Sequence, residues 1–161
     1  MKTGFDLTKR FLIITTVALS SVFAFTACDK DDDDDDDKVM FNLGGSANGT
    51  AVVPAVTTSG AGTISGTFNK NTNVMEYNVG WTGLSDTASA VGFYTGAAGV
   101  NGTLMQDVSI TTVGMDGAAT GSITLTDQQE ADLLAGNLYY LIGTSTYLTG
   151  EVRGQITASP Q

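Results

Sequence analysis

The stretch TISGTFNKNTNVMEYNVGW, residues 63–81, decides the fold because two alternating segments flank a polar turn in it. In the first segment Ile64 and Phe68 alternate with threonine and serine, and in the second Met75 and Val79 alternate with polar residues or glycine. A repeat of two residues is typical of a β-strand with one buried face. The intervening NKNTN favours a turn. The stretch therefore predicts an antiparallel hairpin with one face in a core.

Weaker patterns of the same kind follow along the chain. Val152 and Ile156 alternate with polar residues from Glu151 to Thr157, which predicts another strand with one buried face. The apolar run at residues 138–142 predicts a strand buried on both faces. Further short strands are expected at residues 39–43, 90–95, 103–110 and 118–125.

A short helix is expected between the strands at residues 118–125 and 138–142. Thr126 and Gln129 have the spacing of a capping box, Leu133 supplies an apolar side, and Gly136 can end the helix. Together the patterns predict an all-β domain over residues 39–161. Its expected architecture is an antiparallel, immunoglobulin-like β-sandwich of about eight strands with one short helix.

Residues 1–27 have the pattern of a secretory signal peptide. Lys2, Lys9 and Arg10 precede an apolar run at residues 11–25. A helix of that length spans about 22 Å at ~1.5 Å per residue, which is short of the ~30 Å hydrocarbon core of a bilayer. A cleaved signal peptide is therefore favoured over a transmembrane anchor.

The only cysteine, Cys28, directly follows this run. Phe25-Thr26-Ala27-Cys28 resembles a bacterial lipobox, although leucine is usual where Phe25 stands. The resemblance implies cleavage before Cys28 and a membrane anchor of fatty acyl chains such as palmitate on that residue. Two or three acyl chains hold a protein durably at a membrane, whereas one holds it only marginally.

An acidic tether is expected at residues 28–38, where Lys30 is the only residue between Asp29 and Asp37 that is not acidic. Repulsion between neighbouring charges keeps such a segment extended. A Lys followed by acidic residues after the lipidated cysteine also resembles the signal that sends some Gram-negative lipoproteins to the cell surface. The resemblance implies an outer-membrane lipoprotein that faces outward, with a periplasmic orientation as the alternative. A plain spacer and weak calcium binding remain alternative interpretations.

Composition excludes several classes of function. The chain has 161 residues and a formal charge of −10, and it contains no histidine. Removal of residues 1–27 leaves 4 basic and 16 acidic groups, a charge of −12, which disfavours nucleic-acid binding. Without histidine there is no imidazole catalysis and no His-ligated zinc or copper site. No cofactor and no catalytic constellation is predicted.

Six segments of the chain resemble the CHRD domain, a module that is repeated in chordin and occurs alone in bacterial proteins. They are residues 43–45, 53–58, 77–84, 96–102, 133–140 and 150–156. Three histidines usual in the family are replaced here by Gly92, Tyr94 and Gly143, and Val52 and Ala55 also depart from the pattern. The family has been compared with the sandwich of copper–zinc superoxide dismutases, so the resemblance implies a superoxide-dismutase-like sandwich.

Four residues are candidates for contact with a ligand: Tyr94, Asn101, Tyr147 and Arg153. Tyr94 and Asn101 lie in or beside a glycine-rich loop, and Tyr147 lies in the last hairpin; both tyrosines are expected to be exposed. Arg153 is interpreted either as the receptor of a carboxylate ligand or as a member of a local or cross-strand ion pair. Trp81 and at least one of Tyr139 and Tyr140 are expected in the core instead.

The sequence therefore predicts a non-catalytic, lipid-anchored binding or interaction module of the cell envelope. Its expected partners are the membrane, through Cys28, and a protein or glycan ligand. Two alternatives stay open: a metal-dependent redox or hydrolytic enzyme on the same sandwich, and a purely structural envelope protein. Few ligands other than oxygen atoms and methionine sulfur remain for a metal once Cys28 is lipidated.

Overall fold

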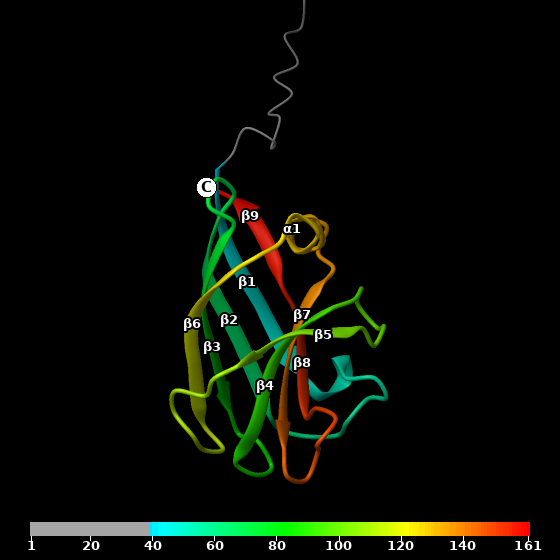
Figure 1. Ribbon diagram of the computed structural model, residues 1–161. Helices are drawn as coiled ribbons and strands as arrows, with labels where there is room; N and C mark the ends of the chain where they lie inside the picture. The colour runs from blue at the N-terminus through cyan, green and yellow to red at the C-terminus, as the bar shows by residue number, and fades with distance from the viewer. Residues whose placement is uncertain (1–38) are drawn as a thin grey trace, which may run out of the picture. The chain divides into compact units, whose positions relative to one another are not determined.

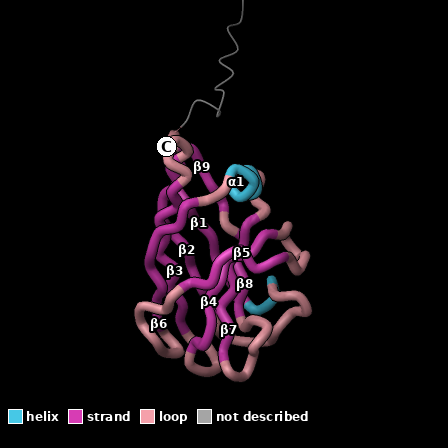
Figure 2. The backbone as a smooth tube through the Cα atoms, viewed as in Figure 1, coloured by secondary structure: helices cyan, strands magenta, loops and turns pink. Residues whose placement is uncertain are grey.

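A computed structural model describes residues 39–161, so the predicted leader, Cys28 and the acidic tether lie outside the described residues. The described elements are β1 (Met40–Asn48), the short 3₁₀ helix η2 (Gly49–Ala51), β2 (Ala61–Asn69), β3 (Val74–Thr82), β4 (Ala88–Thr95), β5 (Thr103–Val108), β6 (Gly117–Thr124), α1 (Asp127–Leu134), β7 (Leu138–Thr144), β8 (Val152–Gln155) and β9 (Thr157–Pro160). Figure 2 shows that strands make up most of this backbone.

The predicted hairpin is confirmed as β2 and β3. The two strands pair along their whole length, with Phe68 opposite Met75 and Ile64 opposite Val79. All four side chains are buried. The Asn69 side chain accepts hydrogen bonds from the backbone N–H groups of Asn71 and Thr72, and Asn73 adopts a φ of 56°. Side-chain capping and a left-handed residue close the turn, as the polar sequence predicted.

The strands form one antiparallel sheet in the order β5-β4-β7-β8-β1-β2-β3-β6, and β9 pairs with β1 beside β8. The sheet folds back on itself, so that β4 faces β3 across the core: the Tyr77 and Phe93 rings meet edge to face at 4.9 Å. Figure 1 shows the two layers and the ends of the described chain side by side at β1 and β9. The prediction of an all-β sandwich is confirmed.

One strand was not predicted. Residues 157–160 have the sequence TASP, without an apolar alternation, yet they form β9 against the first half of β1. The pairing of β9 is therefore set by the path of the chain after β8, and the count is nine strands where about eight were expected.

Helix α1 begins and ends as predicted. The Thr126 hydroxyl accepts from the Gln129 N–H, the Gln129 side chain accepts from the Thr126 N–H, and Gly136 has a φ of 72°. Leu133 is fully buried, and the helix packs against β7 and β9. Within residues 39–161 no helix has the length and apolar character needed to cross a membrane.

Candidate ligand-binding site

Four of the side chains that form the candidate site share the outer face of β4, β7 and β8. Tyr94 lies opposite Tyr139 in the β4–β7 pairing, and Tyr139 and Arg153 lie on neighbouring strands, with Arg153 opposite Leu141. Strand residues at these alternate positions point to the same side of a sheet. The alternation thus brings Tyr94, Tyr139, Leu141 and Arg153 to one surface.

Tyr94, Tyr139 and Arg153 form a three-layer stack. The rings of Tyr94 and Tyr139 are parallel to within 11°, with centroids 5.1 Å apart. The guanidinium carbon of Arg153 lies 3.6 Å from the centroid of the Tyr139 ring. A cation over the face of a tyrosine is attracted by the ring quadrupole, more strongly when the pair is out of water. Tyr139 and Arg153 are 2 % and 1 % exposed, so the inner two layers are out of water.

Of the two interpretations of Arg153, the local or cross-strand ion pair is wrong within residues 39–161. Arg153 donates from Nη2 to the Ala97 carbonyl oxygen at 2.9 Å and stacks on Tyr139 instead. Glu151, two residues away, is fully buried, and its carboxylate accepts hydrogen bonds from Thr58, Ser85 and Thr144. Alternation along this strand predicted an exposed face, but loops cover it, so both faces of β8 are buried.

Two loops cover this face of β8. The first runs from η2 to residue 56, and the second connects β4 and β5 at residues 96–102. The Asn101 side chain joins them by donating to the Val53 carbonyl oxygen at 2.8 Å. The Gln155 side chain holds the second loop by donating to the Gly96 carbonyl oxygen at 2.9 Å, and the Tyr139 hydroxyl accepts from the Gly102 N–H at 3.1 Å.

Two hollows adjoin at Val53 between these loops, and together they are called the trough. One, of about 290 Å³, is lined by Pro54, Tyr94, Asn101, Tyr139, Leu141 and Thr149 among others. The other, of about 300 Å³, is lined by Thr50, Ala51, Ala98, Gly99, Arg153 and Gln155. Each volume is close to the lower limit of the range of ligand pockets, about 300–1,000 Å³.

Arg153, which lines the second hollow, has an unpaired donor. The Arg153 Nη1 atom is buried and has no hydrogen-bond partner among residues 39–161. A buried polar group without a partner is costly, by about 1–3 kcal/mol, and more for a charged group. Among the features of the trough, this unpaired donor is the one best suited to donate a hydrogen bond to a ligand oxygen.

The carboxylate of Asp107 affects Tyr94, which lines the first hollow. Burial raises the pKa of the Tyr94 hydroxyl above its usual value, and the neighbouring Tyr139 and Asp107 raise it further. Asp107 stands opposite Gly92 in the pairing of β4 with β5. The trough therefore has a cation at one end and a carboxylate near the other.

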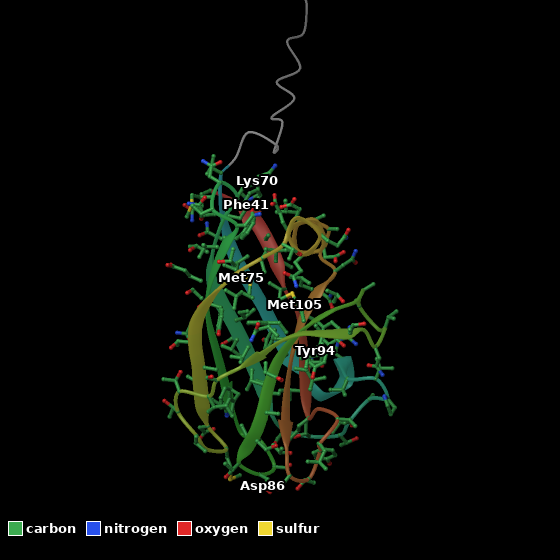
Figure 3. All side chains as sticks on the ribbon, viewed as in Figure 1. Phe41, Lys70, Met75, Asp86, Tyr94 and Met105 are labelled. Carbon is green, nitrogen blue, oxygen red and sulfur yellow. The ribbon has the colours of Figure 1, made fainter. Side chains whose placement is uncertain are left out.

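Three of the four predicted contact residues come together here, and Tyr147 does not. Tyr94, Asn101 and Arg153 line the trough, and Figure 3 places Tyr94 beside the loops on this side of the molecule. Tyr147 lies in the β7–β8 connection, where its backbone carbonyl accepts from Thr144 and Gly150. Tyr94 and Tyr147 were both expected to be exposed, but the structure leaves each of them half-buried.

Tyr139 is the site residue that the sequence missed. Trp81, Tyr139 and Tyr140 are all buried, as expected for core residues. The ring of Tyr139, however, is buried on the outer face of the sheet and not between the layers. Its place in the site follows from its position opposite Tyr94 in the neighbouring strand, a register that the sequence alone does not give.

The positions where the resemblance expects histidine lie on the same outer face. Gly92 and Tyr94 alternate along β4, and Gly143 lies on β7 next to Leu141, the partner of Gly92. Tyr94 therefore places an aromatic ring where the resemblance leads one to expect a histidine. Within residues 39–161, no three Cys, Asp, Glu or His side chains gather as metal ligands.

Family comparison matches most of this domain. The CHRD domain family matches residues 44–156, from β1 to the residue after β8. No curated protein sequence and no solved structure matches the chain. Since the matched span covers more than half of the chain and every residue of the trough, the chain belongs to the CHRD domain family.

Proposed function

We propose that this protein is a lipid-anchored binding module of the cell envelope, without catalytic activity, whose ligand occupies the trough. Membership of the CHRD family indicates a binding or interaction module. The observation that carries the proposal is the Tyr94–Tyr139–Arg153 stack, which places a buried, incompletely paired guanidinium beside a hollow. Aromatic faces with a few convergent polar groups are the usual components of a ligand pocket.

The position of the trough suits a tethered module. The chain enters the domain at Met40, and Arg153 pairs with Asn48 at the other end of β1. Eight residue steps along a strand span about 27 Å at ~3.4 Å each. An acidic tether that continues from residue 39 to a lipid on Cys28 would thus join the domain far from its ligand site. In this proposal the lysine and aspartates after Cys28 direct the protein to the outer membrane and the cell surface.

Cys28→Ser tests the anchor. We expect the variant to accumulate as an unprocessed precursor that takes up no radiolabelled palmitate, because the acceptor thiol is gone. The wild-type chain should be labelled and shorter. Labelling and gel mobility in the cells that produce the protein measure both effects. Palmitate incorporation into the serine variant would refute the anchor.

A further inference from the structure

The most unusual group in the described domain is the guanidinium of Arg153. It is 1 % exposed, and the structure gives it a carbonyl oxygen and a tyrosine ring as partners, with Nη1 unpaired and no carboxylate in contact among the described residues. Buried charges in proteins are as a rule paired, because desolvation of an unpaired ion costs several kcal/mol. A charge that this chain does not neutralise itself is suited to neutralisation by a ligand.

We propose that the trough binds an acidic sugar, with the carboxylate of a uronic acid residue on Arg153. The inference rests on the proposed function and names the ligand class of the same site. Guanidinium groups bind carboxylates through charge-assisted hydrogen bonds, which are shorter and stronger than those between neutral groups. Arg153 is one of the residues that line the 300 Å³ hollow, and a carboxylate bound there would supply the acceptor that its buried Nη1 atom lacks.

The electrostatics of the domain select a ligand of low total charge. Residues 28–161 carry a formal charge of −12, which repels a dense polyanion. Asp107, which pairs with Gly92 on the strand next to Tyr94, raises the pKa of Tyr94 and would also oppose a second ligand carboxylate near that ring. The trough therefore accepts one carboxylate at Arg153 and a neutral unit beside it.

The lining of the trough favours a sugar over a peptide. Thr50, Asn101 and Thr149 bring hydroxyl and amide groups to it, and Tyr94 adds a half-buried aromatic face. A hydroxylated ring needs partners distributed in this way. Extended peptides instead bind by adding a strand to an open sheet edge. Strands β7 and β8 are both paired on each side, so the trough offers no such edge.

Calorimetric titration of the purified full chain tests the proposal with three probes: D-glucuronate, D-glucose as its neutral counterpart, and N-acetylglycine as a mimic of a peptide C-terminus. We expect D-glucuronate to bind at least tenfold more tightly than either of the others at pH 7. Arg153→Lys should weaken the binding at least tenfold, because an ammonium group lacks the planar fork of a guanidinium.

A second variant tests the proposal independently in case the Arg153 variant misfolds. Ala98 is exposed and lines the 300 Å³ hollow, so Ala98→Trp should fill it and abolish glucuronate binding. Ala61→Trp is the matched control, because Ala61 is also exposed and lines a separate hollow of about 260 Å³ over β2 and β3. This control should bind D-glucuronate like the wild type.

Several results would overturn the proposal. They are equal binding of glucuronate and glucose, no binding of either, and glucuronate binding that survives Ala98→Trp. Preferential binding of N-acetylglycine would replace the sugar acid by a peptide carboxylate. Crosslinking on intact cells distinguishes failure of the sugar-acid assignment from failure of the proposed function. If crosslinked products are lost in Ala98→Trp while glucuronate does not bind, only the sugar assignment is wrong; unchanged products would reject the trough as the binding site.

Discussion

Glu151→Ala is expected to lower the free energy of unfolding by about 3–4 kcal/mol, because it removes a buried carboxylate that accepts four hydrogen bonds and leaves the buried Thr144 hydroxyl and three part-buried donors without this acceptor. The Glu151 carboxylate accepts from the Thr58 hydroxyl at 2.6 Å and the Thr144 hydroxyl at 2.9 Å. It also accepts from the backbone N–H of Ser85 at 2.7 Å and from its hydroxyl at 2.8 Å. One side chain thereby joins three loop or strand-end segments. Urea denaturation of the wild type and the variant measures the difference.

The same carboxylate should make stability depend on pH in acid. Burial opposes its ionisation, but the four hydrogen bonds outweigh burial and lower the pKa of Glu151 below its ordinary value of 4.5. In the unfolded chain the group binds its proton at higher pH than in the folded protein. Its contribution to stability is therefore complete above about pH 4.5 and is lost as the pH falls from there toward the lowered pKa.

Glu151→Gln isolates the charge. It should reduce the loss of stability below pH 4.5, since the glutamine has no proton to gain. Glu76→Gln is the matched control, because Glu76 is exposed on β3, and its effect should stay within about 0.5 kcal/mol. An acid unfolding profile that is the same in wild type and Glu151→Gln would show that Glu151 does not control acid stability.

Gly45→Ala is expected to destabilise the domain by about 3 kcal/mol or to prevent folding, because the site has no room for a methyl group. A Cβ atom at residue 45 would lie 2.2 Å from the backbone carbonyl oxygen of Gln155. At this point β1 leaves its pairing with β9 and approaches β8, so the sheet turns from one layer to the other. Relief of the clash requires that one of the two backbones move.

Gly44→Ala is a neighbouring control in the same strand. A Cβ atom there meets only the Thr157 hydroxyl oxygen, at an ordinary 3.7 Å. We expect it to be neutral or to stabilise the fold by about 0.4–1 kcal/mol, since alanine restricts the unfolded chain. Urea midpoints of the two variants give the comparison. Equal midpoints would mean that β1 and β8 are not held in this close approach.

The sequence predicted those parts of the fold whose signal is local. Alternation about Ile64, Phe68, Met75 and Val79 predicted the central hairpin, and the spacing of Thr126 and Gln129 predicted the helix cap. These patterns work because one strand face or one helix turn decides them. Strand β9 has no such pattern, and its pairing depends on the position of β1.

The candidate site was harder to predict because it depends on register and on loops. Tyr94 and Arg153 were identified by residue type, but their connection through Tyr139 requires the pairing of β4, β7 and β8. The polar alternation around Arg153 indicated an exposed strand face, and the residue was interpreted as either a receptor for a carboxylate ligand or a member of an ion pair. The structure buries the residue under the loops after β1 and β4, which no periodicity in β8 reveals.

The most direct test of the trough as the ligand site is a map of backbone amide chemical shifts as D-glucuronate is added to the full chain. We predict that the largest changes fall in residues 49–53 and 96–102 and at Arg153. Residues 61–63 and 80–82, around the separate hollow over β2 and β3, should not change. Changes confined to that second region, or no change at all, would contradict the account.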